Sequence, residues 1–112
     1  MKPVFYRSVM NKTEAEYADQ LELLKRTSEI VDWKFENMKF RLGDGAQPTK
    51  RPPFYTPDFL VVYWDHFELH EVKGGFFREA ARVRIKTAAE LYPWFVWKVI
   101  RLKNGVWETE VM

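Results

Sequence analysis

Two strand-like segments joined by a very short linker place the strongest constraint on how this chain folds. They are residues 58–64 and 67–73, and only Asp65-His66 separates them. The first is rich in valine and aromatic residues, which favour strands, and Gly74-Gly75 ends the second. Because so short a linker leaves no room for a crossover, the two segments are predicted to form an antiparallel hairpin at the centre of a sheet.

Helices are predicted on both sides of this hairpin in the sequence. The first should cover 14–28, with Thr13 as N-cap and Glu16 reaching back to complete a capping box. The second should cover 77–91 and end at Pro93. Each has an apolar stripe at helical spacing, made of Tyr17, Leu21 and Leu24 in the first and Phe77, Ala81, Ile85, Ala88 and Tyr92 in the second.

The rest of the chain supplies further strands. Residues 31–42 read as one extended segment, and a proline-containing loop should follow to Thr56. Strands are also expected over 94–102 and 106–111, joined by a type I′ turn at Asn104-Gly105. The predicted fold is a single α/β domain over 1–112: helix, strand, strand, strand, helix, strand and one extra C-terminal strand, around a mixed sheet.

Composition limits the chemistry open to the 112-residue chain. It has no cysteine, which excludes disulfides, thiolate zinc sites and cysteine nucleophiles. No stretch is apolar enough to span a bilayer, and the start does not resemble a signal peptide, so we expect a soluble cytoplasmic protein with no membrane partner. The net charge of +2 is uninformative, but residues 73–86 carry five positive charges against one negative.

Charged residues gather at one end of the predicted hairpin. If the turn closes around Asp65-His66, Asp58 faces Lys73 and lies diagonal to Glu71, roughly 7–8 Å away at the backbone. Glu14 lies on the same face of the first helix as Tyr17, where an unpaired carboxylate is costly. The helix N-terminus would offset part of this cost, and a cation shared with the other two acids would offset more.

Three carboxylates and a lysine around one point predict a phosphodiesterase site. Carboxylate oxygens suit Mg²⁺, which polarises a phosphoryl oxygen and lowers the pKa of bound water. Lys73 would either orient or deprotonate the attacking water or stabilise charge at the phosphate.

The same residues resemble a known family. Pro57-Asp58 and Glu71-Val72-Lys73 resemble the Pro-Asp…(Asp/Glu)-x-Lys signature of the PD-(D/E)XK nucleases, which have a restriction-endonuclease-like core. Residues 11–17, with Glu14, resemble the first-helix acid motif of the family's small phage and prophage endonucleases, and the resemblance extends over roughly 11–103.

The resemblance implies a DNA endonuclease, phage-encoded and acting in DNA processing or recombination in the host cytoplasm, with branched DNA among its candidate substrates. It implies Glu14, Asp58 and Glu71 as ligands of Mg²⁺, with Mn²⁺ as a substitute, and Lys73 as the catalytic lysine. Glu16 is the fallback for Glu14. The loop over 47–53 is longer than expected for a small member, which leaves the preferred DNA structure open.

Basic residues supply the candidate DNA contacts. Arg78, Arg82 and Lys86 form one stripe of the second helix, and Lys50 and Arg51 form a second basic spot. The alternative for the stripe is an ordinary solvated face.

Two classes of function remain open at this stage. The alternative to a nuclease is a nuclease-fold module that binds DNA without cutting it, and cleavage with Mg²⁺ would separate the two. Cutting both strands of a duplex is expected to need a homodimer.

Overall fold

The computed structural model of this protein describes residues 9–43 and 53–112. In that part of the chain, strands β1, β4, β5, β6 and β7 form one sheet in that order, and β2 pairs with β3 in a separate ribbon. Strands β5 and β6 run parallel, and the other neighbours are antiparallel. The bounds are α2 (Lys12–Arg26), β1 (Asp32–Phe35), β2 (Phe40–Arg41), β3 (Phe54–Tyr55), β4 (Phe59–Val62), β5 (Phe67–Lys73), α3 (Glu79–Leu91), β6 (Val96–Lys103) and β7 (Val106–Val111).

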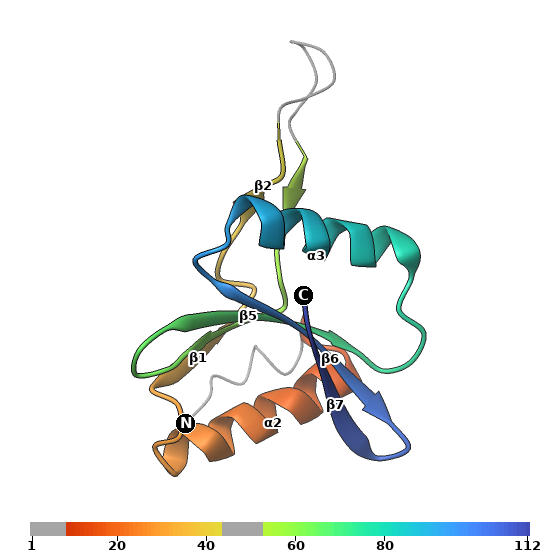
Figure 1. Cartoon of the computed structure of the whole chain (residues 1–112). Helices are drawn as coiled ribbons and strands as arrows, with labels where there is room; N and C mark the ends of the chain where they lie inside the picture. Colours follow the sequence, from red (N-terminus) through yellow and green to blue (C-terminus); the bar gives the residue numbers. More distant parts are fainter. Residues whose placement is uncertain (1–8, 44–52) are drawn as a thin grey trace.

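The two helices cover opposite faces of the mixed sheet (Figure 1). Helix α2 buries Tyr17, Ala18 and Leu21 against one apolar cluster, and α3 buries Ile85 and Ala88 against another. Both predicted apolar stripes are therefore confirmed, as is the mixed α/β class. No helix within the described ranges is long and apolar enough to cross a membrane.

Helix α2 begins two residues earlier than predicted, because a different capping box forms. The Asn11 side chain accepts a hydrogen bond from the Glu14 amide at 2.8 Å, and Glu14 Oε1 accepts one from the Asn11 amide at 2.9 Å. The prediction of Thr13 as N-cap with Glu16 as its partner was wrong. Asn11 and Glu14 have the same three-residue spacing, and asparagine caps at least as well as threonine.

The central hairpin forms, but its register differs by two residues from the prediction. Val62 pairs with Phe67, so the loop has four residues and is closed by a 2.9 Å hydrogen bond from the Tyr63 amide to the His66 carbonyl. Continuing this register places Asp58 opposite Glu71, not opposite Lys73. An even shift leaves every side chain on its predicted face, because side chains alternate along a strand.

The chain between α2 and β4 is less regular than predicted. Glu36 adopts a left-handed conformation with φ 47°, which divides the expected single strand into β1 and β2. The expected loop contains β3, which pairs with β2. Lys50 and Arg51 lie outside the described residues.

The second half of the chain follows the prediction closely. The Asn104-Gly105 turn has positive φ at both residues, 53° and 75°, as a type I′ hairpin requires. Helix α3 begins at Glu79 instead of residue 77, and β6 covers Val96–Lys103 instead of 94–102.

Candidate active site

The predicted acidic residues Asp58 and Glu71 meet at the end of the β4–β5 hairpin, on the face of the sheet that α3 covers. Each side chain is buried, with 8% of its residue surface exposed. Asp58 precedes β4, and its Oδ2 accepts a 2.8 Å hydrogen bond from the Val72 amide of β5. This bond fixes the Asp58 carboxylate against the strand that carries Glu71.

Both oxygens of Glu71 have partners. The Tyr55 hydroxyl donates to Oε1 at 2.6 Å, and Lys73 Nζ lies 3.3 Å from Oε2. Burial, followed by the Glu71 and Asp58 charges, raises the pKa of Tyr55, so its hydroxyl stays protonated as a donor. Tyr55 comes from β3, and the ribbon therefore delivers a side chain directly to the site.

Glu14 approaches Asp58 from helix α2, which covers the opposite face of the sheet. The N-terminus of α2 lies against the end of β5, where a Cβ on Gly74 would be 2.5 Å from Thr13 Oγ1. Only glycine permits this approach without displacement. Glu14 is half-buried there, and it lies close enough to Asp58 to help raise the pKa of that carboxyl group. The structure therefore brings all four predicted residues together, with Glu14 also closing the helix cap.

The surroundings of Asp58 disfavour a negative charge on its carboxyl group. Burial first, then the charge of Glu71 and more weakly that of Glu14, raises the pKa of Asp58 to about 8, although the Val72 amide opposes the shift. Near neutral pH the isolated protein therefore holds a neutral acid at this position.

A second buried carboxylate, on the opposite face of the sheet, shows the contrast. Glu68 is 4% exposed and receives contacts from His66 Nε2 at 2.6 Å, His70 Nε2 at 2.8 Å and Lys98 Nζ at 2.9 Å. Burial alone would raise its pKa, but hydrogen bonds from His70, His66 and Lys98 outweigh burial and lower the pKa of Glu68 to about 2. Burial therefore does not keep a carboxylate protonated here when nitrogen donors surround it.

The donor set at Asp58 fits a hard divalent cation. Its groups are carboxylate oxygens, which Mg²⁺ prefers, and they repel one another in the absence of a cation. Within residues 9–43 and 53–112, no three Asp, Glu or His side chains already stand in the geometry of a metal-binding group. A cation would therefore have to draw Glu14 inward through Oε2, because Oε1 serves the capping box.

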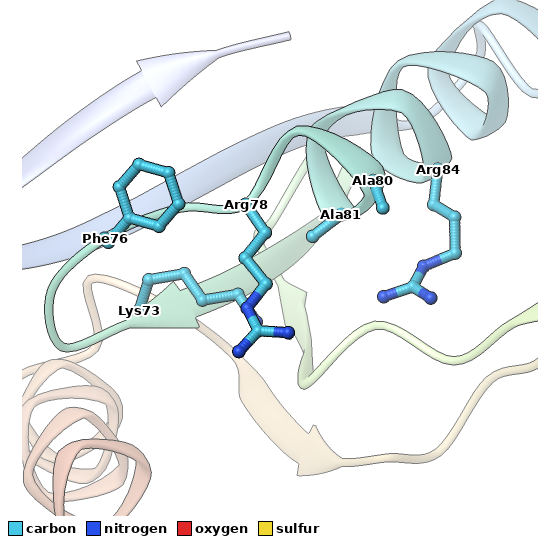
Figure 2. Close-up of a pocket in the computed structure, with 6 residues that line it drawn as sticks. All are labelled: Lys73, Phe76, Arg78, Ala80, Ala81 and Arg84. Carbon is cyan, nitrogen blue, oxygen red and sulfur yellow. The ribbon is translucent and has the colours of Figure 1, made fainter.

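A basic pocket adjoins the acidic cluster. It has a volume of about 280 Å³ and is lined by Lys73, Phe76, Arg78, Ala80, Ala81 and Arg84. Arg78 and Arg84 project from the same side of α3, with Lys73 alongside Arg78 and Phe76 on the loop that leads into the helix (Figure 2). Lys73 belongs to both the pocket and the acidic cluster, so the two are contiguous.

The predicted basic stripe of Arg78, Arg82 and Lys86 does not face a single site. Arg78 lines the pocket, whereas Arg82 forms two bonds to the Glu110 carboxylate of β7, at 2.8 and 3.2 Å. Lys86 also lies near Glu110 and helps to lower the pKa of that carboxyl group. Both residues stay candidates for phosphate contact, on the β7 side of the helix.

Two residues of the site, Tyr55 and Phe76, were missed from the sequence, and Arg84 was placed only within the basic run over 73–86. Tyr55 stood in a segment expected to be loop, although it lies three residues before Asp58 in the motif. Arg84 flanks the buried stripe, three residues after Ala81, and helical spacing was a usable signal for it. Phe76 had no periodic signal, because it lies between β5 and α3.

Comparison with known proteins gave no relative for this chain: no protein-family model matches it, and no curated protein or solved structure does so either.

Replacing Asp58 with asparagine should stabilise the metal-free protein. The folded state raises the pKa of Asp58, so it favours the protonated carboxyl group. The stability that this protonated group contributes is complete below about pH 4, and it is lost as the pH rises to about 8. The loss amounts to at most about 1.4 kcal/mol per pH unit. Asparagine does not titrate, so the advantage of Asp58→Asn over wild type in urea unfolding with EDTA should grow across this range. Exposed Glu90→Gln is the control. An advantage that does not vary with pH would contradict the assignment.

Proposed function

We propose that this protein is a Mg²⁺-dependent DNA endonuclease of the PD-(D/E)XK type. The observation that carries the proposal is that two sites of opposite charge adjoin each other. One is a cluster of buried carboxylates with too few positive charges to neutralise it, the other is a basic pocket, and Lys73 belongs to both. A phosphodiester is the substrate class that needs both a bound cation and cationic side chains.

The order of the elements supports a restriction-endonuclease-like core. Helix α2, strands β1, β4 and β5, helix α3 and strand β6 follow one another as helix, strand, strand, strand, helix, strand, with the β2–β3 ribbon inserted after β1 and β7 added at the end. The motif residues Asp58, Glu71 and Lys73 lie together at the end of the β4–β5 hairpin, which supports a shared site.

In the proposed reaction Asp58 and Glu71, with Glu14, hold Mg²⁺, and Mn²⁺ would substitute for it. When bound, the ion polarises the phosphoryl oxygen and lowers the pKa of the attacking water. Lys73 is positioned by Glu71, and with 31% of its side chain exposed it can reach a phosphate while staying tethered. Its ammonium group would stabilise charge that develops at the reacting phosphate.

The remaining basic residues would hold the DNA backbone. Arg78 and Arg84 line the pocket beside Lys73, and Arg82 and Lys86 would be available further along α3. Lys50 and Arg51 are proposed contacts as well. Phosphate contacts of this kind give affinity without reading the sequence. Cutting both strands of a duplex would require a homodimer of this small domain.

A non-cleaving DNA-binding module is the second candidate function. Two observations favour it. The capping box already engages Glu14 Oε1, and burial and the charge of Glu71 raise the pKa of Asp58 in the isolated protein. In that case the pocket would still bind DNA, but Mg²⁺ would change nothing.

Cleavage assays separate these two functions. Wild-type protein should cut DNA with Mg²⁺ and not with EDTA. Asp58→Ala and Glu71→Ala should reduce the rate to background, and Lys73→Ala should lower the single-turnover rate about 100-fold while DNA binding persists. Glu90→Gln, on the exposed side of α3, is the matched control and should cut normally. Full activity in the Asp58 or Glu71 variant would remove the nuclease assignment from this site.

Tyr55 is proposed as a positioning residue for Glu71. Tyr55→Phe removes the 2.6 Å hydrogen bond and leaves the ring in place. The Mg²⁺ concentration for half-maximal cleavage should rise about 10-fold, and excess Mg²⁺ should restore most of the rate, because partners that orient a metal ligand tune its affinity.

Tyr92→Phe is the matched control for Tyr55→Phe. It also deletes a tyrosine hydrogen bond, of 2.7 Å to the Arg41 carbonyl, and should leave the Mg²⁺ dependence unchanged. An equal shift in both variants would mean that Tyr55 acts only through stability.

A further inference from the structure

The basic pocket is lined by an aromatic side chain, Phe76, that does not pack in the core. Phe76 is 85% exposed, whereas the adjacent Phe77 is 6% exposed and packs in the α3 core. Within the described residues Phe76 has no aromatic partner, although rings elsewhere in the protein pack closely together. Its ring is therefore available to a ligand in the pocket that it lines.

The pocket also has uncompensated positive charge. Arg78 and Arg84 form no ion pair within the described ranges, in contrast to Arg82, which is held by Glu110. Arg84 lies close enough to Tyr55 for its charge to act on that hydroxyl, so the positive charge extends toward the acidic cluster. Two guanidinium groups without an ion-pair partner among residues 9–43 and 53–112, together with one tethered ammonium group, suit an anion with several oxygens, such as a phosphate.

The size of the pocket limits what enters it. A volume of about 280 Å³ is near the lower limit for ligand pockets, enough for one small polar group with a ring and too small for a double helix. Exposed aromatic rings beside cationic side chains are the usual platform for unpaired bases. In a continuous duplex the faces of the bases stack on one another and are not available to such a ring.

We propose that this pocket binds one unpaired nucleotide beside the cleaved bond, with its phosphate on Arg78 and Arg84 and its base stacked on Phe76. The inference rests on the proposed nuclease function and narrows it. The substrate is then a single strand, or a branched DNA with an unpaired segment, and continuous duplex is a poor substrate.

Binding without cleavage tests this directly. Oligonucleotides carrying the fluorescent base 2-aminopurine, as a single strand and as a duplex of the same sequence, are titrated with wild-type protein in EDTA. The single strand should bind about 10-fold more tightly, and the fluorescence of one 2-aminopurine position should be quenched by stacking. Arg84→Ala should lower the salt slope of binding by about 1.

Variants of the exposed ring isolate its contribution. Phe76→Ala should weaken single-strand binding about 10-fold and abolish the quenching, and Phe76→Trp should preserve both. Trp94→Ala is the matched control, because Trp94 is 69% exposed and lies beyond the other end of α3. Its removal should change neither quantity.

The outcomes distinguish this inference from the proposed function. Equal affinity for single strand and duplex, or normal binding by Phe76→Ala, would overturn the inference even if Mg²⁺-dependent cleavage occurs. Single-strand binding that depends on Phe76, without cleavage of any DNA in Mg²⁺, would support the pocket and overturn the nuclease assignment.

Discussion

The antiparallel pairing of β4 with β5 is the constraint on which the site depends. It buries two apolar faces between α2 and α3, and the same register brings Asp58 opposite Glu71 at the open end of the hairpin. The Val72 amide holds Asp58 there at 2.8 Å. The acidic cluster is therefore a consequence of packing that the core would require in any case, and a one-residue change in register would disperse it.

The protein buries two carboxylates in opposite electrostatic environments, and the difference between their pKa values is the main physical reason for assigning a function to one of them. Glu68 is surrounded by three nitrogen donors, and its pKa falls to about 2. Asp58 is surrounded by other acids, and its pKa rises to about 8. An arrangement that costs stability in the isolated chain is expected where a ligand supplies the missing charge. The nearby Lys73, Arg78 and Arg84 are directed at a pocket and not at Asp58.

Sequence reasoning predicted the face of each strand better than its exact pairing. Alternation fixes which side Asp58 and Glu71 occupy, but loop length sets the register, and the turn at Tyr63–His66 has no strong signature. Two overlapping capping boxes have the required three-residue spacing, Asn11 with Glu14 and Thr13 with Glu16, and the structure contains the first. Tyr55 was not predictable, because its contact with Glu71 depends on a short ribbon formed by β2 and β3.

The central claim is that the Asp58 cluster is completed by a divalent cation, and the most direct measurement is the pKa of Asp58 itself. Carbon-detected NMR of its carboxyl group across pH should give a value of about 8 in EDTA. Saturating Mg²⁺ should lower the pKa far below neutrality, because a bound cation favours the charged form. A pKa that is the same with and without Mg²⁺ would contradict the account.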